Sequence, residues 1–177
     1  MRQQRIQKAF EVLGERGAPV APRLRRLLRD PLCCYEAGVS LVGMGEPGLK
    51  QLGDAFQKEN AEVRRVVATV LAGANGSPAD AAGLALKALK DPDGLVRADA
   101  AYSLGRLTQC SDGSVRALAI ALEDPDPRVR YISVFALNRF GTAAQPAIPA
   151  LRKRVEDAEE NIRKGAAEVL IELEKGN

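Results

Sequence analysis

The chain repeats itself every 33 residues, and four consecutive copies can be read in the sequence. The marker pairs of these copies are Val63-Arg64, Val96-Arg97, Val129-Arg130 and Ile162-Arg163. An acidic or amide residue opens each copy, at Asn60, Asp91, Asp124 and Asp157. A repeat of this length, punctuated by Pro and Gly, is typical of a solenoid, in which each unit buries its apolar face only against its neighbours. We therefore expect one repeat domain over residues 1–177.

The composition favours helices as the units of this solenoid. Of the 177 residues, 46% are hydrophobic but only 4% are aromatic, so Leu, Val and Ala supply most of the apolar surface. These side chains are compatible with helices that pack closely. Within one copy the apolar residues recur at helical spacing in two successive stretches: Val96, Ala100 and Leu104, then Val115, Leu118 and Leu122. The sequence thus predicts an all-α fold.

Two of the copies resemble a known family. The pattern D-P-D-x-x-V-R-x-x-A-x-x-x-L stands at Asp91 to Leu104, and again at Asp124 to Leu137 with Ser133 in place of the Ala. It resembles HEAT repeats of the phycobilisome-lyase-like subtype, and the resemblance covers nearly the whole chain. It implies a right-handed α-solenoid of about five helix pairs, with the first helix of each pair on the convex side and the second on the concave side.

The resemblance also predicts where the helices lie. The first helices would cover about 18–29, 47–58, 79–90, 113–123 and 145–156, and the second helices about 33–44, 60–74, 94–107, 127–140 and 160–174. A further helix over about 2–15 would cap the N-terminal end. In the first pair, Asp30-Pro31 is followed by Cys33-Cys34 where Val-Arg stands elsewhere. We therefore expect a connection three residues shorter there, with a tight turn and an irregular stacking angle.

Asp and Arg residues recur at the helix starts. In the triplets Asp91-Pro92-Asp93 and Asp124-Pro125-Asp126 we expect Asp to cap the following helix and Pro to lie in its first turn. The repeated arginines could form an anion-binding ladder. The resemblance implies instead that each bonds to a capping Asp and to backbone carbonyls, and we favour this structural role because buried charges are retained when they are paired. The arginines concerned are Arg64, Arg97, Arg130 and Arg163.

The outward face of the second helices gives the functional prediction. If Val129 and Ser133 face the core, Tyr131 and Phe135 face outward. Equivalent positions of earlier copies hold Tyr102 and, allowing for the shorter connection, Tyr35, so all three tyrosines share this face. They could fill gaps between neighbouring helices, but aromatic residues are also enriched at the centres of protein interfaces. We predict a partner-binding site formed by Tyr35, Tyr102, Arg106, Tyr131, Ile132, Phe135 and Arg139.

Catalysis is not expected. The chain has no His, the side chain that most often acts as acid-base group or metal ligand near neutral pH. It also lacks the nucleophile-elbow, phosphate-loop and CxxC motifs. The adjacent Cys33 and Cys34 could form a chromophore-attachment or redox site, but we favour packing, because adjacent cysteines form only a strained disulfide. We therefore predict no enzyme, no metal and no cofactor.

The charges and the remaining segments limit the partners. Residues 1–29 hold eight Arg or Lys against two Glu, although the whole chain carries only +3. The densest part, Arg23 to Arg29, reads as the solvated face of a helix whose Leu residues are buried. No stretch is long and apolar enough for a signal peptide or a membrane span, and three cysteines do not make a disulfide framework. We therefore expect a cytoplasmic protein with no membrane partner.

These observations favour a non-catalytic scaffold or adaptor that binds a protein in the concave groove. One alternative is a bilin-lyase-like chaperone for tetrapyrrole attachment, in which Arg106 and Arg139 meet the propionates. The other is a nucleic-acid-binding module that uses the basic N-terminal end, which we do not favour. Ile171 stands where earlier copies have Gly105 and Asn138, so it faces outward and predicts self-association at the C-terminal end.

Overall fold

The computed structural model describes residues 14–109 and 111–175. In these residues it contains ten α-helices and three short 3-10 helices, and no β-strand. The first helices of the five pairs are α2 (Ala21–Leu27), α4 (Glu46–Lys58), α6 (Pro78–Ala88), α8 (Ser111–Ala121) and α10 (Ile148–Arg154). The second helices are α3 (Cys34–Gly43), α5 (Ala61–Val70), α7 (Gly94–Arg106), α9 (Pro127–Asn138) and α11 (Glu160–Lys175). The predicted helix at 2–15 lies outside the described residues.

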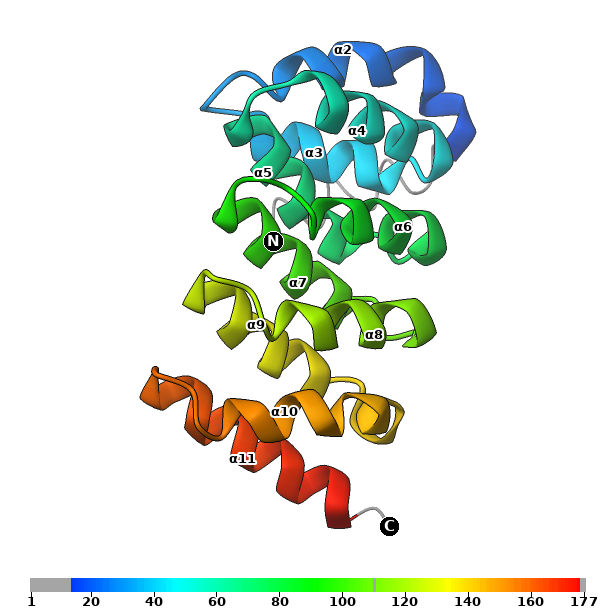
Figure 1. Cartoon of the computed structure of the whole chain (residues 1–177). Coiled ribbons are helices and arrows are strands. Elements are labelled where there is room, and N and C mark those ends of the chain that lie inside the picture. Colours follow the sequence, from blue (N-terminus) through cyan, green and yellow to red (C-terminus); the bar gives the residue numbers. More distant parts are fainter. Residues whose placement is uncertain (1–13, 110, 176–177) are drawn as a thin grey trace.

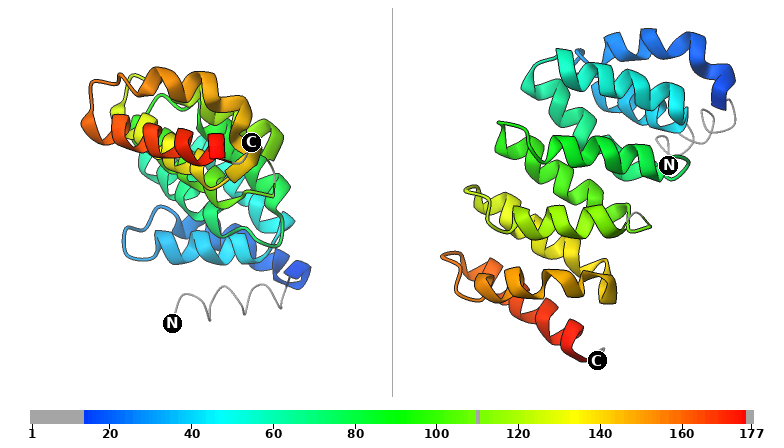
Figure 2. Two further views of the ribbon diagram at one scale, coloured as in Figure 1. Left: turned by 90° about the horizontal axis from the view of Figure 1, so that it is seen from below. Right: turned by 45° about the vertical axis from the view of Figure 1, so that its right-hand side comes forward.

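The five pairs stack along one axis to form an all-α solenoid. Figure 1 shows the order from α2 at the top to α11 at the bottom, and Figure 2 shows the same stack from below and turned to the side. The second helices pack against one another more extensively than the first helices do. Closer packing is expected of helices on the inner side of a curve, and the resemblance implies that position for the second helices.

Proline explains where the observed helices depart from the predicted bounds. The helices α2 and α10 are short because a 3-10 segment precedes each of them, at η1 (Gly14–Val20) and η3 (Gly141–Ala147). Each segment contains one proline, and a second proline stands at the start of the α-helix. Because proline lacks an N–H and restricts the residue before it, the α-helix begins only one residue before the second proline. Similarly, α5 continues beyond Val70 as the 3-10 turn η2 (Leu71–Gly73).

The core lies between the two layers and is continuous along the stack. One cluster of buried apolar residues extends from Ala21 to Leu173, and a smaller one is formed by Ala68, Ala88, Val96 and Ala100. Its largest buried side chains are mostly leucines, among them Leu41, Leu71, Leu104 and Leu137 at equivalent positions of successive repeats. A single domain over the whole chain stays a prediction, because the described residues begin at position 14.

The turn of the first pair is tight, as the shortened connection predicts. Asp30 organises it: its backbone carbonyl accepts hydrogen bonds from the N–H groups of Cys33 and Cys34, at 3.2 and 2.8 Å. Its side chain accepts a third bond, 2.9 Å long, from the N–H of Leu32. The turn therefore closes within the few residues between α2 and α3.

Candidate functional site

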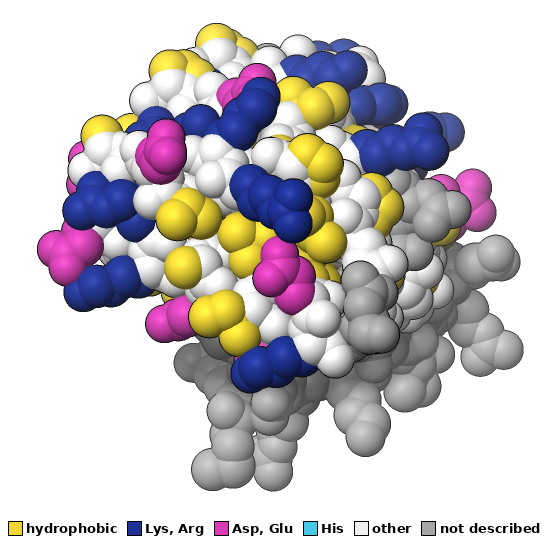
Figure 3. Space-filling view, turned by 60° about the horizontal axis from the view of Figure 1, so that its bottom comes forward, with side chains coloured by type: hydrophobic (Ala, Val, Ile, Leu, Met, Phe, Trp, Pro, Cys, Tyr) yellow, Lys and Arg dark blue, Asp and Glu magenta, His cyan; other side chains and the backbone are white. Residues whose placement is uncertain are grey.

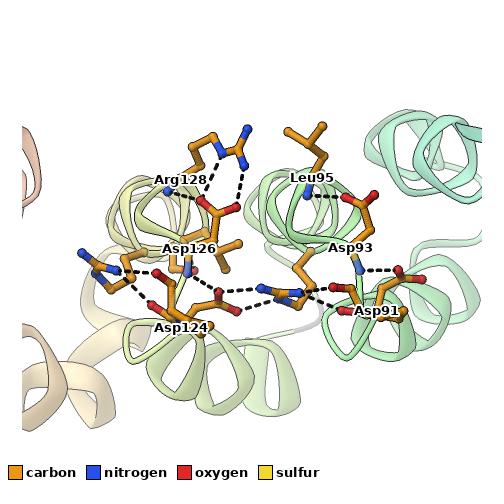
Figure 4. Close-up of polar contacts among 12 residues, drawn as sticks. Asp91, Asp93, Leu95, Asp124, Asp126 and Arg128 are labelled. Atoms are coloured by element: carbon orange, nitrogen blue, oxygen red, sulfur yellow. Dashed lines mark hydrogen bonds and ion pairs between the residues drawn. The ribbon is translucent and has the colours of Figure 1, made fainter. Parts of the chain in front are cut away.

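The repeated arginines form a structural ladder along the helix starts, which Figure 4 shows for two neighbouring repeats. Arg97 is representative: its Nε and Nη2 donate to the two carboxylate oxygens of Asp124 at 2.7 and 2.8 Å. Its Nη1 donates to the backbone carbonyls of Asp91 and Pro92, just before its own helix. Arg64 makes the same forked pair with Asp91 in the following repeat. Each arginine thus ties its own repeat to the next.

The last links of the ladder differ in one respect. Arg130 forms the forked pair with Asp157, at 2.9 and 2.8 Å. Arg163 keeps the bonds to the carbonyls of Asp157 and Ala158, at 2.7 and 2.9 Å, but its Nε and Nη2 have no partner among the described residues. In the interior repeats the ladder arginines are therefore bonded to carboxylates and carbonyls of the protein itself, as the structural role predicts.

The structure corrects the assignment of the helix caps. The residue that caps α7 is the second acid of its triplet, Asp93, whose side chain accepts a hydrogen bond of 2.8 Å from the N–H of Leu95. The side chain of the first acid, Asp91, instead accepts hydrogen bonds from the Arg64 guanidinium and from the N–H of Asp93. Pro92 lies before the helix and not in its first turn, because α7 begins at Gly94. The same division of roles recurs in the next triplet, where Asp126 caps α9.

Asn60, the residue that opens the second repeat in the sequence, also has a role other than the expected one. Asn60 caps α5 by accepting from the N–H of Val63, so it corresponds to Asp93 and not to Asp91. The true equivalent of Asp91 is Lys58, which cannot accept a hydrogen bond. The first and second repeats are joined differently: Arg29 at the end of the first helix makes a forked pair with Glu59, with both bonds 2.8 Å long.

The ladder lowers the pKa values of its carboxylates. Hydrogen bonds from Arg130 are the largest cause that lowers the pKa of Asp157 to about 2, and they outweigh its burial. Burial is the largest influence on Asp91 and raises its pKa, but the bonds from Arg64 and from the N–H of Asp93 together lower the pKa below the usual value. Both carboxylates are therefore ionised at neutral pH.

The aromatic face predicted from the sequence is an exposed surface of the second-helix layer. Half of the surface of Tyr102 and of Phe135 is accessible, 50% and 47%, whereas Tyr131 and Ile132 are partly buried against the core. The rings of Tyr131 and Phe135 lie 4.7 Å apart at an angle of 57°. Exposed aromatic side chains that gather in one place are typical of interaction surfaces.

These residues line two adjoining depressions, which we call the aromatic groove. The larger, about 620 Å³, is lined by Thr69, Ala98, Asp99, Tyr102, Pro127, Arg128, Tyr131, Ile132, Glu159 and Asn161. The other, about 380 Å³, is lined by Tyr102, Tyr131, Ile132, Phe135, Ala136, Asn138 and Arg139. Three residues, Tyr102, Tyr131 and Ile132, belong to both. The groove therefore spans α7 and α9, and the start of α11 closes one end.

The remaining predicted site residues lie near this groove but do not all line it. Tyr35 is 40% exposed on α3, two repeats away, so the structure does not bring it together with the other aromatic residues. Arg106 is exposed at the end of α7 outside the two depressions. Arg139 lines the smaller one, and its Nε donates to the carbonyl of Gly105 at 2.7 Å.

The polar rim of the groove is what sequence reasoning missed. Asp99 accepts hydrogen bonds from Arg65 at 2.9 Å and from Thr69 at 3.1 Å. Arg128 pairs with Asp126 at 2.8 Å and thereby lowers the pKa of that carboxyl. Arg65 and Thr69 do carry a sequence signal, because they stand 33 residues before Ala98 and Tyr102 on the outward face, whereas Asp99 and Arg128 carry none.

The C-terminal end of the stack mixes charged and apolar side chains. Ile171 is 51% exposed, as predicted, and lies beside a third depression with Phe135, Glu168 and Glu172. Figure 3, in which this end comes forward, shows hydrophobic side chains between basic and acidic ones. Self-association there stays a prediction.

The described residues also show two cysteines, and they were compared with the requirements of a membrane span and of a metal site. Cys33 and Cys34 are free, partly buried thiols, and burial is the largest cause that raises the pKa of Cys33. No helix of the described part is long and apolar enough to cross a membrane. The same residues contain no group of three or more His, Cys, Asp or Glu that could hold a metal ion.

Comparison with solved structures gives neighbours that include repeat proteins and enzymes of similar fold. One chain of the CpcE and CpcF complex of phycocyanin lyase from Nostoc sp. PCC7120 is 22% identical, with a TM-score of 0.70 over 85% of this chain and 98% of that chain. A designed armadillo repeat protein in complex with the peptide (KR)4 is 17% identical, with a TM-score of 0.61 over 97% and 90%. Human deoxyhypusine hydroxylase in complex with glycerol is 22% identical, with a TM-score of 0.58 over 96% and 67%. At these identities the likeness concerns the fold alone.

Comparison of the amino-acid sequence with curated proteins and with family models identifies the family. No curated protein matches the chain. The family model for HEAT repeats matches residues 49–120 and 115–176, which together are more than half of the chain. These two matches cover the repeats in which the Arg–Asp ladder is complete. The chain therefore belongs to the HEAT repeat family.

Proposed function

We propose that the protein is a non-catalytic scaffold or adaptor that binds a protein partner in the aromatic groove. One observation supports this most: Tyr102 and Phe135 remain half-exposed although α7 and α9 are otherwise packed against their neighbours. Rings that contribute to stability would be covered, whereas rings that anchor a partner must be accessible before binding. The fold likeness to a designed armadillo protein that holds a peptide agrees with this use of a solenoid surface.

The absence of catalysis and the cytoplasmic location belong to the same proposal. The sequence has no His, and the carboxylates whose pKa is lowered are each engaged by an arginine or a lysine, as Asp91 and Asp157 are by ladder arginines. None of them is available as an acid or base near neutral pH. The free thiols of Cys33 and Cys34 agree with a reducing compartment.

The proposal is tested by truncating the exposed rings. Tyr102→Ala and Phe135→Ala should each weaken binding of a partner captured from the source organism by about thirty-fold, which corresponds to about 2 kcal/mol. The matched control is Ile120→Ala, because Ile120 is 75% exposed on α8 in the other helix layer. This control should retain the partner. If both ring variants unfold the protein, or if Ile120→Ala loses the partner equally, the groove is not the binding site.

A second candidate function is a chaperone of tetrapyrrole attachment. It is favoured by the fold likeness to CpcE and CpcF of phycocyanin lyase and by Arg139, a cation beside the aromatic side chains. Mixing the protein with a linear tetrapyrrole should then change the visible absorbance, and Phe135→Ala should remove the change. A nucleic-acid role is less well supported, because Arg25 and Arg29 of the basic end pair with Asp54 and Glu59.

A further inference from the structure

Two arginines near the aromatic groove have no carboxylate partner among the described residues. Arg106 and Arg139 stand 33 residues apart, at the end of α7 and directly after α9. Both are exposed, and neither forms an ion pair with any described residue. By contrast, the arginines nearer the starts of α5, α7 and α9 are matched by carboxylates: Arg64, Arg65, Arg97, Arg128 and Arg130.

The position of Arg139 is fixed by the protein. The bond from its Nε to the carbonyl of Gly105 holds the guanidinium at the end of α7, where Arg106 is the next residue in the chain. Its two Nη groups make no hydrogen bond to a described residue and remain available as donors. Two guanidinium groups from adjacent helices, whose axes lie about 8–10 Å apart, create a positive region that the fold leaves uncompensated.

The smaller depression of the groove combines this charge with apolar walls. Tyr102, Tyr131, Ile132 and Phe135 form the walls, and Arg139 stands at the rim. Such a site fits a ligand segment that has a large apolar side chain next to an anionic group. A planar guanidinium with two free donors matches a carboxylate in particular.

The carboxylates around the groove leave this positive region intact. Asp99 is engaged by Arg65 and Thr69, and Glu159 lies at the other end of the groove, at the start of α11. On α11, Glu172 pairs with Lys175, and Glu168 lines the third depression, which shares Phe135 and Asn138 with the smaller depression of the groove. The groove is therefore positive over the ends of α7 and α9 and negative towards α11.

We propose that the groove recognises an acidic-apolar peptide segment, whose carboxylates pair with Arg106 and Arg139 while its apolar side chains enter between Tyr102 and Phe135. This inference rests on the proposed function and specifies the chemistry of its partner. The negative side chains of the segment lie over the ends of α7 and α9. A basic segment is disfavoured there, because it would bring like charges together.

The experiment compares two blocked nonapeptides by isothermal titration calorimetry with the full chain. One consists of three glutamate-leucine-leucine units and the other of three lysine-leucine-leucine units. We expect the glutamate peptide to bind at least about tenfold more tightly, a difference of about 1.4 kcal/mol. The double variant Arg106→Glu/Arg139→Glu should reverse this preference. Arg116→Glu is the matched control, because Arg116 is exposed on α8 in the other layer, and it should leave both affinities unchanged.

The outcomes separate this inference from the proposed function. If the double variant does not fold, Arg106→Glu alone decides, because Arg106 makes no hydrogen bond or ion pair with a described residue, and it should reduce the preference at least threefold. Equal binding of both peptides, lost together in Tyr102→Ala, would retain the groove as a binding site and overturn the acidic preference. Preference for the lysine peptide, or binding of neither peptide, would also overturn it.

Discussion

At the scale of single residues, the two acids of each helix-start triplet have separate tasks. Asp91 receives the arginine of the preceding repeat, whereas Asp93 caps the helix. The family resemblance implies that Arg and Asp pair in the copies that carry both residues. It does not tell the two acids apart, since both stand within reach of the helix start. Only the backbone path, which turns between them, decides which oxygen meets which donor.

The lowered pKa of Asp157 predicts how stability depends on pH. Because the pKa is about 2 in the folded protein, against an ordinary value of 3.8 in the unfolded chain, the unfolded chain takes up the proton first as the pH falls. The contribution of this carboxylate, about 2 kcal/mol, is complete above about pH 5 and is lost between about pH 4 and pH 2. Urea unfolding at several pH values measures it.

The control for this pH dependence is Asp157→Asn. This variant should be less stable at neutral pH, and its free energy of unfolding should fall less steeply below pH 4 than that of the parent. An unchanged slope would mean that Asp157 titrates equally in both states. The remaining slope would come from other carboxylates whose pKa values are lowered, such as Asp91 and Glu59.

At the scale of helices, the family resemblance predicted every pair, and the deviations are local. The interior helices α4, α6, α7 and α9 agree with the predicted bounds to within a few residues. The short helices α2 and α10 could not be predicted by transferring the pattern of other repeats, because their proline pairs change the hydrogen bonding of the first turn. Where these two helices begin therefore depends on the prolines of the first turn and not on the spacing of the apolar residues.

Close packing between α7 and α9 depends on a residue without a side chain. A Cβ at Gly105 would lie 2.8 Å from the Cα and Cβ of Ala136, and a backbone atom cannot yield as a flexible side chain does. Gly105→Ala should therefore push the two helices apart and lower the free energy of unfolding by about 1–3 kcal/mol. Thermal or urea unfolding would detect this change.

The opposite result is expected at Gly83, which serves as the matched control. Gly83 lies within α6, and a Cβ there would meet nothing within 4 Å. Gly83→Ala should stabilise the protein by about 1 kcal/mol, because alanine favours the helix. If Gly105→Ala were as stable as Gly83→Ala, the two inner helices would not be in the close contact described.

At the scale of the whole molecule, the ladder makes interior and terminal links unequal. Arg97→Ala should lower the free energy of unfolding by about 3 kcal/mol, because it leaves the largely buried Asp124 without its partner. Arg163→Ala should lower it by only about 1 kcal/mol, since it removes bonds to carbonyls alone. Equal losses in chemical unfolding would contradict the view that the ladder works between repeats.

The candidate site could be predicted only in part, and the reason lies at this same scale. The phase of one helix suffices to show that Tyr102, Tyr131 and Phe135 face outward. The polar rim comes from different repeats, as when Arg65 reaches Asp99. Which of these residues meet depends on how far each repeat is rotated relative to the next, and a repeating sequence does not specify that rotation.

The forked pairs also determine how the molecule can flex. They lie along one edge of the stack, where each first helix turns into its second helix (Figure 4). Two parallel hydrogen bonds resist both stretching and twisting, so this edge of the stack is stiffer than the opposite edge. Elastic bending must then separate mainly the opposite ends of the second helices. A partner inserted between Tyr102 and Phe135 would work against the stiffness of the edge that carries the forked pairs, which limits how wide the groove can open.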